Sequence, residues 1–426
     1  MEGLLLFGLF FFLLFLGVPI LTSAGIPTLL LVWHFGLGLD MFSANFFSNI
    51  AKFPLLAIPF FILAGFIMER VGLSRRLVNL LALLVGPIPG GLGIVAILSC
   101  VLFGAVSGTG PADTAAIGAV MIPAMVKRGY HKPFAAALVA SAATTDVLIP
   151  PSLAFVLYGV ITETSIGGLF AAGMLPGLLM GLVLVVPVYW ISKKRGYGGD
   201  RWGTRAEIWQ ALKDASLGLL APVIILGGIY GGIFTPTEAA IVAAIYGFAV
   251  GGFIYRNLTV KVFYEVVRDS ALSSGILMII VAFAGLLGWT GSTLGVMEKA
   301  AAAMLTVSTD PFWVLMMING ILLVAGCLMD GVSIWYIFTP IMIPIIKYFN
   351  WDFMWFGVVM ALNLSIGTIT PPVALNLFVA SNLANISMET ISKAVLPFFL
   401  ALLVALLITS YVPWLSLWFP TIIGLH

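Results

Sequence analysis

Charge is what this sequence has least of. Only 8% of its 426 residues are Asp, Glu, Lys or Arg, whereas ordinary globular domains carry about 25%. Hydrophobic residues make up 62%, and so few charges cannot cover the surface that a soluble domain exposes to water. The composition therefore excludes an ordinary water-soluble protein.

Long charge-free stretches separate the few charges. Each is longer than the roughly 20 residues that an α-helix needs to cross the hydrocarbon core of a membrane. The stretches are continuously apolar and do not alternate, which excludes a transmembrane β-barrel. We therefore predict an all-α polytopic membrane protein. The stretches are 3–39, 77–112, 164–192, 215–237, 270–297, 353–388 and 394–425.

Groups that carry enzyme, metal or nucleotide chemistry are also scarce. Cys100 and Cys327 lie in apolar segments, so two buried thiols are expected rather than a structural disulfide. The histidines at 34, 131 and 426 show no metal-ligand spacing, and no nucleophile–base pair is evident. The sequence has no GxxxxGKS or GxxxxGKT motif, so this chain does not itself hydrolyse ATP. The net charge of +2 says nothing about nucleic acid. We expect no nucleic acid partner, no cofactor and no enzymatic activity, and an ion gradient is the natural energy source.

The N-terminal stretch does not resemble a cleaved signal peptide. Its only charge is Glu2, and the apolar run continues past the GVP at 17–19, so we predict a first transmembrane helix. The stretch 47–84 mixes charged and apolar residues, and is either an amphipathic arm or a tight loop between two crossings. Basic residues are densest at 193–205, the best candidate for a cytoplasmic loop.

The chain repeats itself across a polar segment. Residues 193–214 separate a first repeat at 1–192 from a second at 215–426. The double prolines Pro150-Pro151 and Pro371-Pro372 are 221 residues apart, and the same offset pairs Pro123 with Pro344, Pro176 with Pro397 and Gly110 with Gly331. Such repeats are common in secondary transporters, often with inverted topology. This sequence shows the repeat but not the inversion.

Each repeat has a proline break inside an apolar stretch, TTDVLIPPS at 144–152 and SIGTITPPV at 365–373. Irregular backbone survives in a membrane only where protein or an aqueous cavity covers it. Its free carbonyl groups can bind a cation, and its free N–H groups can face an anion. Prolines in membrane helices are also often mere kinks, and that interpretation stays open.

A segment rich in small residues precedes each break, at 103–118 and at 325–336, and indicates a re-entrant hairpin. We place hairpin and broken helix together at about 95–165 and about 312–388. A hairpin tip that faces a broken helix would form a two-sided clamp. Two clamps imply two cation sites with a substrate pocket between them.

At these residues the chain resembles the large membrane subunit of the tripartite ATP-independent periplasmic (TRAP) transporters. The resemblance rests on SGTGPADTAA at 107–116, TPTEAA at 235–240, AIPFFILAG at 57–65 and the paired double prolines, and it covers nearly the whole chain. It implies an elevator-type fold of two inverted repeats in the bacterial inner membrane. It also implies sodium-driven symport of an organic acid anion.

The resemblance further implies two protein partners, a small four-helix membrane subunit and a periplasmic substrate-binding protein. No second subunit is fused here, so the small subunit is expected as a separate chain. Sialic acid is slightly favoured over a C4-dicarboxylate, because the hairpin tips carry no arginine to bind a second carboxylate. The main alternative is a stand-alone Na+- or H+-coupled carboxylate carrier. An intramembrane enzyme or a channel is the other alternative.

Carried onto this sequence, the resemblance also implies the site residues. The first sodium site should involve Gly104, Ser107, Asp146, Ile149 and Pro151. The second should involve Gly326, Gly367, Thr370 and Val373. The substrate is expected between them, at Ser107, Thr109, Ser152, Asp330 and Asn376.

Several of these residues allow a second interpretation. Asp146 stands opposite Gly367 in the repeat, where the family prefers a small residue, so its carboxylate either strengthens cation binding or only bonds to neighbouring hydroxyl groups. Ser107 and Thr109 could simply let helices pack closely. Asp113 is either functional or a cap for a helix that begins after it, at 114. The glutamate of TPTEAA is predicted to cap a helix.

Overall fold

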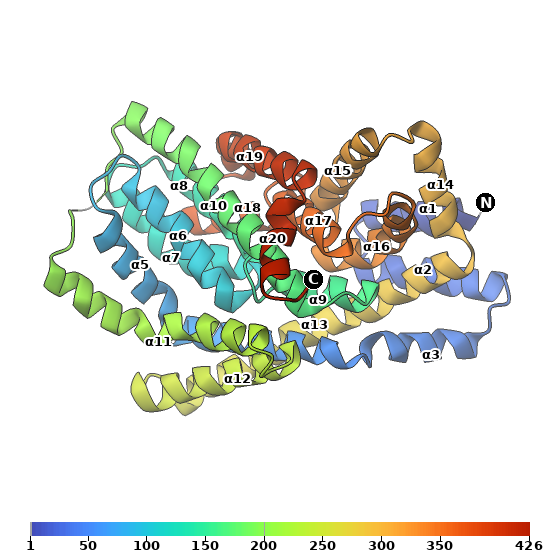
Figure 1. The fold of residues 1–426 in the computed structure, drawn as a ribbon, viewed down its shortest axis with the longest axis horizontal. Helices are drawn as coiled ribbons and strands as arrows, with labels where there is room; N and C mark the ends of the chain where they lie inside the picture. The colour runs from blue at the N-terminus through green and yellow to red at the C-terminus, as the bar shows by residue number, and fades with distance from the viewer. Residues whose placement is uncertain (1, 200) are drawn as a thin grey trace.

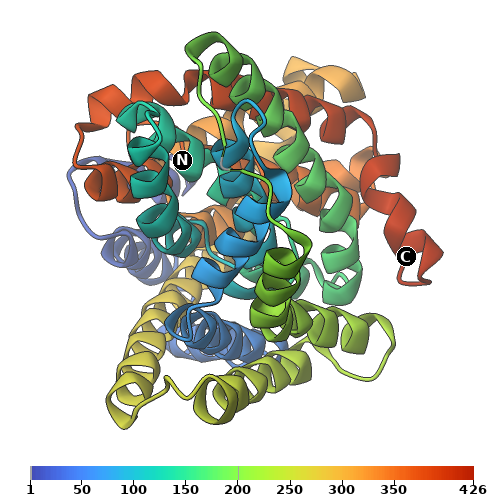
Figure 2. The same cartoon turned by 90° about the vertical axis from the view of Figure 1, so that its left-hand side faces the viewer.

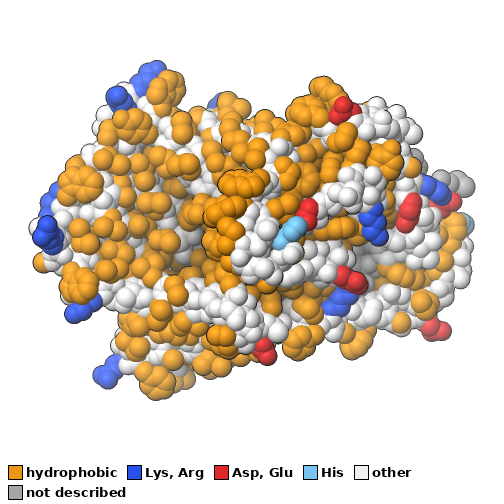
Figure 3. Space-filling model, viewed as in Figure 1, with side chains coloured by type: hydrophobic (Ala, Val, Ile, Leu, Met, Phe, Trp, Pro, Cys, Tyr) orange, Lys and Arg blue, Asp and Glu red, His pale blue; other side chains and the backbone are white. Residues whose placement is uncertain are grey.

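The computed structural model describes residues 2–199 and 201–426, and the regular elements in these ranges are all helical (Figure 1). Eight helices of this part of the chain are long and apolar enough to cross a membrane. Apolar side chains cover much of the face seen in Figure 3, as expected for helices that face lipid. The prediction of an all-α polytopic membrane protein is confirmed.

The N-terminal apolar stretch forms two helices, so the prediction of one first transmembrane helix is wrong. These are α1 (Glu2–Phe15) and α2 (Ile20–His34), which lie against each other. The chain turns between them at Gly17, whose φ of 80° is accessible to glycine without steric cost. Pro19 then precedes the first residue of α2.

Most of residues 39–85 are helical, so the interpretation of 47–84 as a tight loop does not hold. The elements are α3 (Leu39–Ile50), a 3-10 turn η1 (Phe53–Leu56), α4 (Ala57–Arg70) and α5 (Leu73–Val85). In α5, Leu77 and Leu81 are buried, whereas Arg75 and Asn79 are exposed. This helix is amphipathic, and it lies against the helix that follows it.

Two helical hairpins occupy the positions that the sequence suggested for re-entrant segments. The first consists of α6 (Gly91–Ser107) and α7 (Gly110–Lys127), and the second of α15 (Pro311–Leu328) and α16 (Gly331–Tyr348). Only two residues connect the helices of each hairpin. Figure 1 shows α6 and α7 toward one end of the long axis of the molecule, and α15 and α16 toward the other.

Both double-proline segments interrupt a helix. The first broken helix comprises α8 (Lys132–Ala142), the 3-10 turn η2 (Ala143–Val147) and α9 (Leu153–Thr162). The second comprises α17 (Phe353–Gly367) and α18 (Leu375–Ala384). The Pro–Pro peptide bond is cis in both breaks. Each broken helix contacts the other repeat: α9 lies against α16, and α18 lies against α7 and α8.

The remaining helices are mostly long. They are α10 (Ile166–Arg195), α11 (Arg205–Tyr230), α12 (Pro236–Ala249) with a π-helical continuation η3 (Val250–Ile254), α13 (Val260–Thr293), α14 (Val296–Val307), α19 (Met388–Tyr411) and α20 (Trp414–Ile422). Glu238 forms a capping box with Thr235 at the start of α12, which confirms its predicted role as a cap. The polar segment 193–214 belongs partly to the end of α10 and partly to the start of α11.

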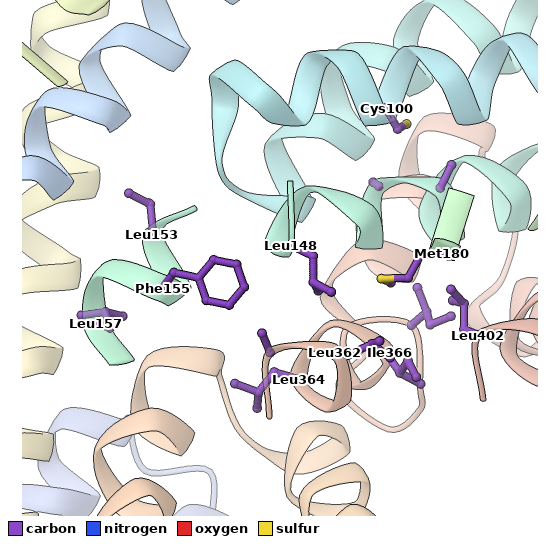
Figure 4. Close-up of a cluster of buried hydrophobic side chains, with 14 of the residues drawn as sticks. Cys100, Leu148, Leu153, Phe155, Leu157, Met180, Leu362, Leu364, Ile366 and Leu402 are labelled. Atoms are coloured by element: carbon purple, nitrogen blue, oxygen red, sulfur yellow. The ribbon is translucent and has the colours of Figure 1, made fainter. Parts of the chain in front are cut away.

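One apolar cluster of buried side chains extends through most of the helices. Figure 2 shows the yellow-green and yellow helices α11 to α13 along one side of the molecule, and both α12 and α13 lie against α4. The same cluster includes residues of the hairpins and broken helices, and joins the two halves there. Figure 4 shows members of this cluster, among them Leu148 of the first break and Leu362, Leu364 and Ile366 of α17.

Candidate functional site

The first hairpin touches the first break through two glycines. A β-carbon added to Gly104 would lie 2.7 Å from the Cβ and 2.8 Å from the Cα of Asp146. One turn later, a β-carbon added to Gly108 would lie 3.3 Å from the carbonyl oxygen of Pro151. Because no side chain larger than hydrogen fits at Gly104, α6 and η2 approach to backbone contact. We call this contact the first clamp.

The second hairpin touches the second break in a similar way. A β-carbon added to Gly367 would lie 2.6 Å from the Cα of Gly326. Nearby, the backbone N–H of Val373 donates a hydrogen bond of 3.2 Å to the carbonyl of Cys327. We call this contact the second clamp. The sequence predicted that both glycines would be site residues, and the structure brings them together.

Two buried carboxyl groups lie at the first clamp. Asp146 is wholly buried, and neither of its carboxyl oxygens has a hydrogen-bond partner among the described residues. Asp113 is also wholly buried; its Oδ1 accepts a hydrogen bond from the Ser107 hydroxyl, whereas its Oδ2 has no partner in that part of the chain. A β-carbon at Gly104 would lie 3.4 Å from this Oδ2, so both aspartates contact the position of the same glycine.

This geometry argues against one interpretation of each aspartate. Asp113 is not the cap of a helix that begins at 114, because α7 already begins at Gly110. Asp146 accepts no hydrogen bond from a neighbouring hydroxyl, because Thr144 and Thr145 donate theirs to the backbone carbonyls of Ser141 and Ala142. Sequence reasoning did not place Asp113 in a site, although an ionisable residue inside an apolar stretch was a usable signal.

A cavity of about 250 Å³ lies beside the tip of the first hairpin. Ser107 and Thr109 line it from the hairpin, Gly65 and Glu69 from α4, and Ser273 from α13. The wall formed by α4 is close to the tip, because a β-carbon at Gly65 would lie 3.2 Å from the Cα and 3.3 Å from the carbonyl oxygen of Ser107. This cavity therefore lies between the hairpin and the helices α4 and α13.

The other predicted substrate residues lie elsewhere. Ser152 is wholly buried, and its hydroxyl donates to the Val147 carbonyl within the first break. Asn376 is wholly buried, and its amide donates a 3.3 Å hydrogen bond to the carbonyl of Ala140. Asp330 caps α16 by accepting from the backbone N–H and hydroxyl of Ser333, at 3.0 and 2.7 Å. The structure thus brings only Ser107 and Thr109 of this set to the cavity.

Two further predicted ligands of the second clamp are Thr370 and Val373. Thr370 donates its hydroxyl to the carbonyl of Ile366 at 2.8 Å, and 41% of Val373 is exposed. Unlike Val373, Ile149, a predicted ligand of the first clamp, is buried.

The part of the chain that the structure describes shows no site for a metal bound by thiols or imidazoles. No group of three or more His, Cys, Asp or Glu side chains able to hold a metal ion occurs within 2–199 and 201–426. Cys100 and Cys327 are free thiols. The clamps instead offer oxygen atoms, which are the ligands of hard cations.

Comparison with known proteins identifies the family. The family model described as "Tripartite ATP-independent periplasmic transporter, DctM component" matches residues 7–415. The chain is 46% identical to an isethionate TRAP transporter permease protein, DctMQ, of Oleidesulfovibrio alaskensis, over 97% of this chain and 66% of that protein. It is 39% identical to the C4-dicarboxylate TRAP transporter large permease protein DctM of Vibrio cholerae, over 99% and 98% of the two chains.

Two further similarities concern another relative and the fold. The sialic acid TRAP transporter large permease protein SiaM of Vibrio cholerae is 36% identical over 96% of each chain. The crystal structure of the YdaH transporter of Alcanivorax borkumensis has a TM-score of 0.67 at 16% identity, over 90% of each chain, and supports the fold alone. The described residues contain eight candidate spans, and the chain is a multi-pass protein of the inner membrane. It belongs to the DctM component family of the tripartite ATP-independent periplasmic transporters.

Proposed function

We propose that this chain is the membrane subunit of a sodium-coupled secondary transporter that imports an organic acid anion. The pair of clamps carries the proposal, because in each of them a glycine of a hairpin touches the beginning of a proline break. Discontinuous helices of this kind bind ions and substrates near the midplane of membrane transporters. Relatives named for isethionate, C4-dicarboxylate and sialic acid support the substrate class.

Sodium is the coupling ion of the proposal, bound at both clamps. The first site uses Gly104, Ser107, Asp146, Ile149 and Pro151, and the second uses Gly326, Gly367, Thr370 and Val373. Carbonyl groups freed by the breaks supply oxygen ligands, and a cation there holds hairpin and break together. Ions that organise the site raise the affinity for the substrate, and by linkage the substrate raises theirs equally.

The substrate anion binds between the clamps, near Ser107 and Thr109. No arginine is found among the described residues that line the cavity at this hairpin tip. One anionic group is therefore easier to accommodate than two, which keeps sialic acid ahead of a C4-dicarboxylate. Ser152, Asp330 and Asn376 remain predicted substrate residues, and each would reach the anion only after the clamps rearrange.

Transport is proposed to follow an elevator motion of inverted repeats. The hairpins and broken helices move as one body against α4 and α11 to α13. The opposite placement of the two hairpins along the long axis supports the inversion (Figure 1). Lys and Arg side chains gather at the left end in Figure 3, which supports a cytoplasmic location for that end.

Two partners complete the proposal, a small four-helix membrane subunit and a periplasmic binding protein that delivers the anion. A stand-alone Na+- or H+-coupled carrier is the second candidate, because it would use the same clamps. Proteoliposomes that contain this chain and its small subunit distinguish the two. Radiolabelled sialic acid and C4-dicarboxylates are supplied with and without a sodium gradient, and with and without the binding protein.

Uptake only when both sodium gradient and binding protein are present is the expected result. Uptake that needs sodium but not the binding protein would favour the stand-alone carrier. Uptake that ignores sodium would overturn the assignment of both clamps as cation sites.

A further inference from the structure

We propose that a groove between the end of α10 and the beginning of α19 binds the phosphate headgroup of an anionic phospholipid, with Lys194, Arg195 and Lys393 as its contacts. The groove is lined by none of the clamp residues, and the proposal does not depend on which anion or cation is transported. It assigns a membrane lipid as a specific ligand of this chain.

Three helix ends form the groove. It has a volume of about 710 Å³ and is lined by the end of α10 and by the beginnings of α8 and α19. Lys194 and Arg195 line it from α10, Lys393 from α19, and His131 from the position before α8. The volume is in the range of cavities that hold small-molecule ligands. Figure 1 shows the end of α10 at the upper left, and Figure 3 shows Lys and Arg side chains there.

The groove has an excess of positive charge. No Asp or Glu is found among the described residues that line it. A larger cavity of about 820 Å³ beside α11 also contains arginines, but Glu207 and Asp214 line it as well and offset much of their charge. The groove is therefore the better site for an anion, because its charges all have the same sign.

The neighbours of these basic groups leave their charge available. Neither Lys194 nor Arg195 forms an ion pair within the described part of the chain, and Arg195 donates a 3.5 Å hydrogen bond to the neutral hydroxyl of Tyr197. Lys393 pairs with Glu389 of its own helix at 2.6 Å. Both side chains of this pair are more than three-quarters exposed, so water screens it and a phosphate group can compete for the lysine.

Apolar side chains continue from the groove along both helices, which favours a lipid over a free phosphate ion. On α10, Leu182, Val186 and Trp190 are exposed and recur every four residues, so they form one stripe that leads to the groove. Leu396 and Leu400 are exposed on α19. Acyl chains can lie along these side chains while the basic groups bind the phosphate. Basic pockets between membrane helices on the cytoplasmic side bind anionic headgroups in this way.

The experiment measures lipid binding directly. The full chain with its small subunit is purified in detergent and freed of lipid. Native mass spectrometry then follows binding as phosphatidylglycerol is added, or phosphatidylcholine with the same acyl chains. The test variant combines Lys194→Gln, Arg195→Gln and Lys393→Gln.

A matched control variant removes the same charge elsewhere. It combines Arg205→Gln, Lys213→Gln and Lys261→Gln, three exposed positions that do not line the groove. Thermal unfolding without lipid shows whether both variants are folded. Inorganic phosphate is added in a further arm, to distinguish a lipid headgroup from a free anion.

We expect the wild type to bind one phosphatidylglycerol at least about tenfold more tightly than phosphatidylcholine. Each basic residue near an anionic membrane surface contributes about a fivefold factor to binding. The test variant should therefore lose the preference for phosphatidylglycerol, whereas the control variant should keep it. Inorganic phosphate should not displace the lipid, because it gains nothing from the apolar stripe.

Three results would overturn the proposal. Equal binding of the two lipids by the wild type would show that the groove does not select an anionic headgroup. Equal losses in the test and control variants would indicate a general effect of charge. Displacement of the lipid by inorganic phosphate would assign the groove to a free anion. If the test variant does not fold, Lys194→Gln alone replaces it and should weaken phosphatidylglycerol binding about fivefold.

Discussion

The hydroxyl of Ser365 donates a hydrogen bond of 3.0 Å to the backbone carbonyl of Thr144. Thr144 lies 221 positions before Ser365, which is the offset that relates the two repeats. Both residues are wholly buried at the start of a proline break. The two breaks therefore meet at equivalent positions of the two repeats. This hydrogen bond joins the two breaks directly.

Loss of this link should be measurable as a loss of stability. Ser365→Ala removes the donor and leaves the Thr144 carbonyl buried without it, which should cost about 1–3 kcal/mol. The measurement is unfolding in mild detergent as denaturant concentration increases. Ser392→Ala is the matched control, since that hydroxyl bonds at 2.6 Å to Met388 of its own helix and should matter less. Equal effects of the two variants would contradict the linking role of Ser365.

The glycine contact of the second clamp should not tolerate a methyl group. Gly367→Ala places its β-carbon 2.6 Å from the Cα of Gly326, so backbone must move, at a cost of about 1–3 kcal/mol. We expect sodium-dependent uptake to fall strongly in proteoliposomes. Gly320→Ala is the control, because no atom lies within 4 Å of its added methyl group. Normal uptake by Gly367→Ala would show that this close contact is not needed.

A substitution at the contact between α4 and the tip of the first hairpin would test the proposed elevator motion. Gly65→Ala brings a methyl group to 3.2 Å from the Cα of Ser107, tight enough to hinder sliding without displacing the fold. We expect slower uptake with unchanged ²²Na+ binding. Gly275→Ala, in α13 with open space around it, should transport normally. A parallel loss of sodium binding in Gly65→Ala would point to damage of the clamp instead.

The two thiols should differ in reactivity. Cys100 is wholly buried in α6, whereas Cys327 is partly exposed beside the second clamp. A maleimide should therefore modify Cys327 at least about tenfold faster than Cys100 in the folded protein, because thiol reactivity follows exposure. Mass spectrometry of digested protein measures both rates, and unfolding the protein should make them similar. Faster modification of Cys100 would contradict the packing of the first hairpin.

Sodium should also slow the modification of Cys327. Its carbonyl accepts the hydrogen bond from Val373, so a cation that closes the second clamp would hold this segment more tightly. Choline is the control cation. An identical rate in sodium and choline would indicate that the cation does not organise the second clamp.

The sequence alone determined the class of protein and the place of the unusual backbone. Each charge-free stretch, folded as a helix, is long enough to cross the hydrocarbon core of a bilayer, and this leaves few options other than transmembrane helices. Double prolines at one repeat offset marked the breaks, because proline cannot continue a helix. The turn at Gly17 and Pro19 carried the same kind of signal and was missed, because the apolar run around it looked uninterrupted.

Only the tertiary structure decided which residues touch. The helices α7 and α16 begin 221 residues apart, as the breaks do, yet Gly326 follows Gly104 by 222 residues, so the glycine that makes the contact is shifted by one position between the two hairpins. It was likewise packing between distant segments that placed Asp146 and Asp113 beside one glycine and left three of their four carboxyl oxygens without a hydrogen-bond partner among the described residues. A sequence lists polar groups and their spacing along the chain. Whether a buried carboxylate is satisfied depends on atoms that only folding brings within hydrogen-bond distance.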